Sequence, residues 1–94
     1  MSSYLIGKII RLGATFEVDS VATDPTTVSL IVQDPDGVDT TYTYPASVSK
    51  SATGVYYYDL TLSAAGLYCY RWVGTGAAAA VEEGNIQSAE SLVI

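Results

Sequence analysis

The residues of this sequence that could take part in catalysis or metal binding are a single cysteine, Cys69, and ten aspartates and glutamates. The chain has no histidine. Without an imidazole there is no base for a Ser-His-Asp triad, none to activate a thiol, and no histidine ligand for zinc. Cys69 falls inside an expected strand, which predicts a buried and unreactive thiol. With no second cysteine, we also expect no disulfide.

Paired carboxylates are the remaining route to catalysis, since glycosidases need only two of them. Nearly all acidic residues here fall in expected turns or on expected solvent faces, and one small domain leaves little room for a cleft that would raise a carboxyl pKa. The acids are Glu17, Asp19, Asp24, Asp34, Asp36, Asp39, Asp59, Glu82, Glu83 and Glu90. We therefore expect no catalytic residue and no enzyme activity.

The stretch Asp34-Pro35-Asp36-Gly37-Val38-Asp39 alternates carboxylates before a glycine, as calcium loops do. An EF-hand also needs a bidentate glutamate at the twelfth loop position, which here is Pro45. A hairpin turn explains the stretch better, because proline presets the backbone and glycine accepts positive φ. Gly74-Thr75-Gly76 lacks the further glycines of a nucleotide loop and is interpreted as a turn that ends a strand. We expect neither a metal site nor a cofactor.

Eight tyrosines make a carbohydrate platform worth testing, because aromatic rings stack on sugars. Tyr56, Tyr57 and Tyr58 are consecutive, so strand alternation sends Tyr57 to the face opposite its neighbours. We expect Tyr57 to be the exposed ring. The other tyrosines and Trp72 are expected to pack in the core or at its edges.

The net charge of −6, with four basic residues against ten acidic ones, opposes binding to nucleic acid and to anionic membranes. No apolar run is long enough to span a bilayer. The segment around residues 4–10 is interrupted by Lys8 and lacks a cleavage site, so it does not predict a secretory signal. We expect the chain to be made and folded in the cytosol.

Short alternating segments separated by turn residues predict one all-β domain over residues 1–94. The first expected strand covers residues 9–18, with Leu12, Ala14, Phe16 and Val18 facing the core. The others cover residues 27–33, 38–44, 55–62 and 67–73, with a last strand somewhere in residues 85–94. The second and third should form a hairpin.

The stretch Ala64-Ala65-Gly66-Leu67-Tyr68-Cys69-Tyr70 resembles the tyrosine corner of immunoglobulin-like domains, with Gly66 and Tyr68 in the corner positions. In that motif the tyrosine hydroxyl bonds to upstream backbone. Antibody domains place a disulfide cysteine two residues after the tyrosine, where this chain has Tyr70. The resemblance implies an immunoglobulin-like antiparallel β-sandwich of about seven strands without the antibody disulfide.

A second resemblance covers most of the chain. The order of short motifs is similar to that of small immunoglobulin-like structural proteins of tailed bacteriophages. These motifs are residues 11–16, Asp24-Pro25-Thr26-Thr27-Val28, Asp34-Pro35-Asp36-Gly37, residues 65–72 and Gly74-Thr75-Gly76. This implies a non-catalytic virion protein, made in the host cytoplasm, that decorates the capsid exterior or the neck. Its partners would be the major capsid protein or head-tail and neck proteins, and a homo-oligomer suits the symmetry of a virion.

The apolar ends of the chain are the expected docking surfaces, with Tyr4, Leu5 and Ile6 at one end and Leu92, Val93 and Ile94 at the other. A final buried strand would explain the second group equally well. Two other functions stay open. One is a glycan-binding adhesion module that uses Tyr57, and the other is a tail or baseplate assembly component.

Overall fold

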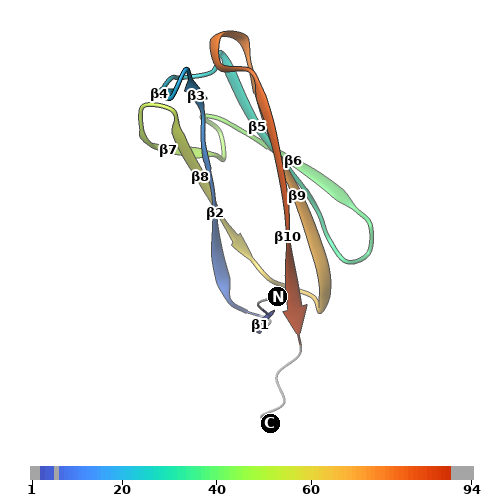
Figure 1. Cartoon of the computed structure of the whole chain (residues 1–94). Helices are drawn as coiled ribbons and strands as arrows, with labels where there is room; N and C mark the ends of the chain where they lie inside the picture. Colours follow the sequence, from blue (N-terminus) through green and yellow to red (C-terminus); the bar gives the residue numbers. More distant parts are fainter. Residues whose placement is uncertain (1–2, 6, 90–94) are drawn as a thin grey trace.

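The computed structural model describes residues 3–5 and 7–89, with side chains from residue 7 to residue 88. In this part of the chain there are ten strands, one short 3₁₀ turn and no α-helix (Figure 1). The strands are β1 Ser3–Leu5, β2 Ile9–Thr15, β3 Glu17–Val18, β4 Val21–Ala22, β5 Thr27–Gln33, β6 Asp39–Thr43, β7 Ser49–Ala52, β8 Val55–Thr61, β9 Gly66–Thr75 and β10 Ala80–Ala89, with the turn η1 Gly76–Ala78 between the last two. The protein is therefore all-β, as predicted.

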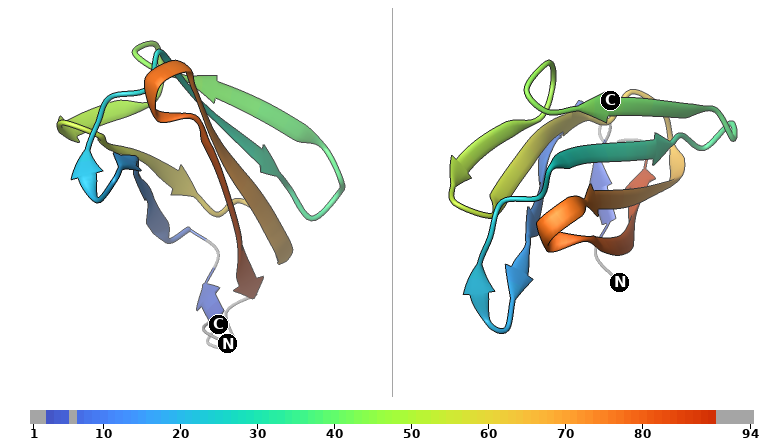
Figure 2. Two further views of the ribbon diagram at one scale, coloured as in Figure 1. Left: turned by 45° about the horizontal axis from the view of Figure 1, so that its top comes forward. Right: turned by 90° about the horizontal axis from the view of Figure 1, so that it is seen from above.

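Two sheets make up most of the molecule (Figure 2). The larger has the order β1-β10-β9-β5-β6 and the smaller has the order β2-β8-β7, while β3 and β4 form a separate short hairpin. The described pairings are antiparallel except that β1 runs parallel to β10. Side chains of both sheets meet in one core, in which Trp72, Leu30 and Leu62 are fully buried.

The β5–β6 hairpin follows directly from its residue pattern. β5 covers the predicted residues 27–33, and its alternate residues Val28, Leu30 and Val32 are buried. The turn that follows is closed by the Asp34 carboxylate, which accepts hydrogen bonds from the backbone N–H groups of Asp36 and Val38. The Asp34 side chain therefore stabilises the turn in which Asp34 itself lies, as aspartate commonly does at the first position of a turn.

Val18 corrects the expectation of one strand over residues 9–18. β2 ends at Thr15, and β3 pairs with β4 in a tight hairpin that leaves Val18 exposed. Asp19 and Ser20 at its tip have φ values of 50° and 66°. Left-handed conformations at both central positions are what a type I′ two-residue turn requires, and alternation alone does not reveal them.

The expectation that Gly74-Thr75-Gly76 ends a strand is confirmed only at its last residue. β9 continues through Gly74 to Thr75, and Gly76, with a φ of 84°, begins the turn η1. A Cβ atom at Gly74 would lie 2.6 Å from the ring of Phe16, so the glycine makes room for core packing rather than ending the strand. The last strand begins earlier than predicted, at Ala80, because it pairs with β9 from Gly74 onward. The rest of the predicted range, residues 90–94, lies outside the described residues.

Candidate functional site

The corner between β8 and β9 is closed by Tyr68. Its buried hydroxyl accepts hydrogen bonds from the backbone N–H groups of Ser63 and Ala64, each at 3.1 Å. This is the upstream backbone contact that the corner motif implies. Gly66 has a φ of +127°, and a Cβ atom there would lie 2.6 Å from Cβ of Pro35, so no larger residue fits. Both residues have a structural part in the fold.

Tyr57 lies on the outward face of the smaller sheet, but it is half-buried and partly covered. The Arg11 guanidinium lies 4.0 Å from its ring centroid, a cation–π contact. Arg11 also donates to both carboxylate oxygens of Asp59, at 2.8 and 3.1 Å, and this hydrogen bonding lowers the Asp59 pKa. Tyr44, at 41%, is a more exposed ring, which corrects the expectation for Tyr57. A sugar could reach only the part of Tyr57 that Arg11 leaves free.

Asp24 bonds to three residues of the β7–β8 hairpin, a contact that no pattern in the sequence predicts. Its carboxylate accepts hydrogen bonds from Lys50 Nζ at 2.7 Å, from the Gly54 N–H at 2.7 Å and from the Tyr56 hydroxyl at 3.2 Å. The bond from Lys50, followed by that from Gly54, lowers the pKa of Asp24. The contact fastens the loop before β5 to the β7–β8 hairpin. Its partners are 26 to 32 residues away, so only the fold brings them together.

Cys69 is half-buried on the outward face of β9, whereas we expected it to be buried. Over residues 3–5 and 7–89, no group of three His, Cys, Asp or Glu residues is placed to hold a metal ion. Asp34 and Asp36, the first acids of the calcium-like stretch, lie in the β5–β6 turn. Their arrangement is that of a hydrogen-bonded turn.

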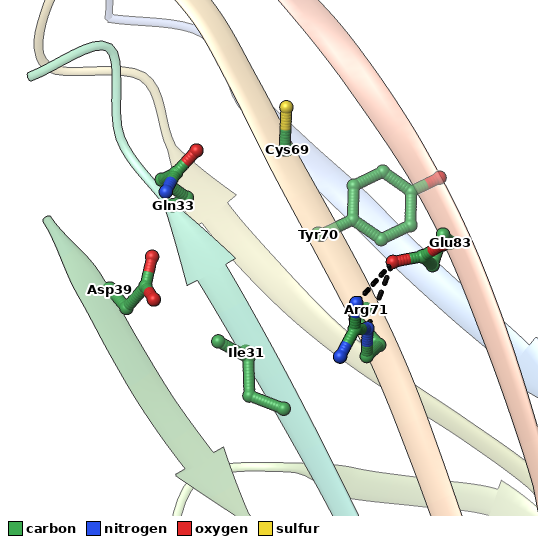
Figure 3. Close-up of a pocket in the computed structure, with 7 residues that line it drawn as sticks. All are labelled: Ile31, Gln33, Asp39, Cys69, Tyr70, Arg71 and Glu83. Carbon is green, nitrogen blue, oxygen red and sulfur yellow. Dashed lines mark hydrogen bonds and ion pairs between the residues drawn. The ribbon is translucent and has the colours of Figure 1, made fainter. Parts of the chain in front are cut away.

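The described structure has two surface hollows of interest. One lies on the outer face of the larger sheet and has a volume of about 290 Å³. Figure 3 shows the side chains that line it. Strand register arranges its surroundings in two rows, Thr41–Ile31–Arg71–Glu83 and Asp39–Gln33–Cys69–Asn85. Arg71 donates from Nε and Nη2 to Oε2 of Glu83, at 2.9 and 2.7 Å. The hollow is thus open to solvent, with half-buried Ile31 and Cys69 among a neutral amide, the Asp39 carboxylate and the Arg71–Glu83 ion pair. We call it the outer hollow.

The second hollow measures about 210 Å³ and lies beneath the core-facing side of β6. It exists because β7 pairs with β8 only over residues 55–57, so the smaller sheet is too narrow to cover β6. Tyr42 stacks on Tyr58 with ring centroids 4.2 Å apart. Hydrogen bonding to the Tyr42 hydroxyl, followed by burial, raises the pKa of Tyr58 to about 12. Its lining residues are Val32, Asp34, Val38, Thr40, Tyr42, Leu60, Thr61, Ser63 and Tyr68.

Val38 and Tyr44 stand at the two ends of β6 and are 57% and 41% exposed. Strand alternation places them on the same side as Thr40 and Tyr42. We call these four residues the β6 overhang. Figure 1 shows the β5–β6 hairpin extending away from β7 and β8.

The predicted docking residues at the chain ends lie largely beyond the described structure. Tyr4 and Leu5 belong to β1, where their backbones pair with Ser88 and Ala89. Ile6, Leu92, Val93 and Ile94 lie outside the described residues. Docking through these segments stays a prediction.

Comparison with known proteins yields no assignment, since no family model and no curated protein sequence matches the chain. None of the described segments is a helix both long and apolar enough to cross a membrane. The function must therefore be inferred from the fold and its surfaces.

Proposed function

We propose that the chain is an immunoglobulin-like β-sandwich built from its seven strands of four or more residues. The strand order supports this, since β10-β9-β5-β6 facing β2-β8-β7 matches the GFCC′ and BED arrangement of such domains. The Tyr68 hydroxyl contact also supports it, because the tyrosine corner occupies the same connection there.

In function, the protein is a non-catalytic structural component of a tailed-phage virion, made in the host cytoplasm. It decorates the capsid exterior or the neck by contacting the major capsid protein or a head-tail protein. The motif order described above supports this setting. Binding to the assembled particle and not to free subunits would stabilise the particle by mass action.

The observation that carries this proposal is the composition of the outer hollow. An apolar centre around Ile31 lies within a rim formed by a neutral amide, the Asp39 carboxylate and the Arg71–Glu83 ion pair. Protein interfaces combine an apolar centre with a polar rim in this way. Such an open surface suits a protein partner better than an enclosed small molecule. The outer face of β6-β5-β9-β10 is therefore the docking surface.

The test is binding of the purified chain to expanded capsids from the same source, measured by co-sedimentation and by size-exclusion chromatography with light scattering. We expect saturable binding. Ile31→Glu replaces the apolar residue at the centre of the outer hollow with a charged one and should weaken binding by about tenfold or more.

Thr15→Glu is the matched control, because Thr15 is exposed on the outward face of the other sheet. It should leave capsid affinity within about twofold of the wild type. Equal loss in both variants would contradict docking through the outer hollow. No capsid binding by the wild type would reject decoration and direct the search to neck, tail or baseplate proteins, and then to glycans.

A further inference from the structure

β6 is an open edge of the larger sheet. It pairs with β5 on one side, and no described strand lies on its other side. Edge strands expose unpaired N–H and C=O groups, and proteins usually protect them with lysine, proline, bulges or short length. β6 has the sequence Asp-Thr-Thr-Tyr-Thr, with neither lysine nor proline, and its pairing to β5 has no bulge.

Two of the other open edges, those of β7 and β2, are better protected or already covered. β7 has four residues, contains Lys50 and pairs irregularly between Lys50 and Ala52. β2 is longer, but its core-facing residues Leu12 and Ala14 are 3% and 5% exposed, so pairing there would hide little more of them. The β6 overhang, by contrast, leaves apolar and aromatic surface in water.

We infer that β6 is a self-association strand, which pairs antiparallel with β6 of a second copy about a two-fold axis at Thr41. This register joins the two larger sheets into one continuous sheet. In this register all five residues of β6 pair with residues of the second copy, whereas a register shifted in either direction would leave some of them unpaired. Association through β6 is separate from capsid binding and does not depend on it.

The residues placed opposite one another in this register are compatible. Val38 meets Tyr44 of the second copy at both ends of the ladder, so these two exposed apolar members of the overhang cover each other. Asp39 is the only charged residue of β6, and it meets Thr43. The two aspartates are then four residues apart along the ladder, or about 13 Å, so no like charges are directly opposed.

The test uses disulfide capture at the two-fold axis. Directly opposed residues in antiparallel strands have Cα atoms about 4.5 to 5.5 Å apart, within the range of about 4.4 to 6.8 Å that a disulfide requires. Thr41→Cys is exposed and outward-facing, and Cys69→Ser in the same chain removes the native thiol. Gly13→Cys, with the same Cys69→Ser change, is the matched control on the β2 edge. A Cβ atom at Gly13 meets nothing closer than the Tyr56 carbonyl oxygen at 3.8 Å.

In a glutathione redox buffer, we expect cross-linked dimer from Thr41→Cys at about ten times the level from Gly13→Cys or more, measured on non-reducing gels. Equal cross-linking, or more from Gly13→Cys, would overturn the assignment.

Sedimentation equilibrium of chains without an introduced cysteine measures dimerisation independently of disulfide formation. Thr41→Lys opposes two ammonium groups at the axis and should weaken dimerisation by about tenfold or more, while Thr15→Lys should not. A wild-type chain that stays monomeric at millimolar concentration would refute the proposal.

Discussion

β2 and β6 are both edge strands, yet the opposite sheet covers them very differently. On β2, the core-facing Leu12 and Ala14 are almost fully buried, whereas three of the four residues of the β6 overhang are exposed and Tyr42 is half-buried. Both strands alternate regularly, so alternation determines which side chains face inward in each. Whether those side chains are buried depends on the width of the sheet opposite, which stops short beneath β6 because β7 pairs with only part of β8.

The largest expected effect comes from truncating one residue on each strand. Leu12→Ala should lower the free energy of unfolding by about 2 to 5 kcal/mol, because it opens a cavity in the core. Val38→Ala should change it by no more than about 0.5 kcal/mol, since Val38 is already mostly in water. Denaturant unfolding of dilute monomeric protein measures both. Similar losses would mean that β6 is covered as fully as β2.

A smaller loss is expected at the corner that closes one end of the hollow beneath β6. Tyr68→Phe removes the acceptor for the Ser63 and Ala64 N–H groups and should cost about 1 to 3 kcal/mol of unfolding free energy. Tyr57→Phe is the matched control, because Tyr57 is half-buried and its hydroxyl makes no hydrogen bond to the described residues, so a smaller loss is expected. Equal stability of Tyr68→Phe and the wild type would show that the corner contact contributes nothing.

The smallest expected effect is a loss of stability at low pH, because protonation of Asp24 weakens its contacts with the β7–β8 hairpin. The pKa of Asp24 is lowered in the folded state, so its carboxylate stabilises the fold above its ordinary pKa of about 3.9. This contribution is lost as pH falls through the lowered folded value. The wild type should therefore have a higher Tm than Asp24→Asn at pH 7, and the difference should shrink below about pH 4.

Asp36→Asn, which alters an exposed turn carboxylate, is the control for charge alone. A Tm difference between wild type and Asp24→Asn that stays constant from pH 7 to about pH 2 would contradict the linkage to Asp24.

Sequence patterns predicted those features of the fold that depend only on residues close together in the chain. The bounds of β5, its hairpin with β6 and the inward phase of β8 and β9 all follow from alternation and turn residues. Val18 was misplaced because two left-handed residues turn the chain just after it. Gly74 was misread because its neighbour in space, Phe16, is far away in sequence.

The surfaces were harder to predict, because they depend on register. Arg11 and Asp59 are 48 residues apart and meet only because β2 pairs with β8 in one particular alignment. The outer hollow likewise combines residues of four strands. To predict the exposure of the β6 overhang one must know the length of β7, which is a strand of the other sheet. No pattern within residues 38–44 contains that information.

The parallel pairing of β1 with β10 has a mechanical consequence. Ser3 to Leu5 lie beside Gln87 to Ala89 and run in the same direction. A pulling force applied between Ser3 and Ala89 along the strands would slide the two past each other, so the rungs of this ladder would share the load. An antiparallel pair pulled from neighbouring ends would instead open one rung at a time. A module tethered at both ends would thus resist tension at the place where the tethers attach.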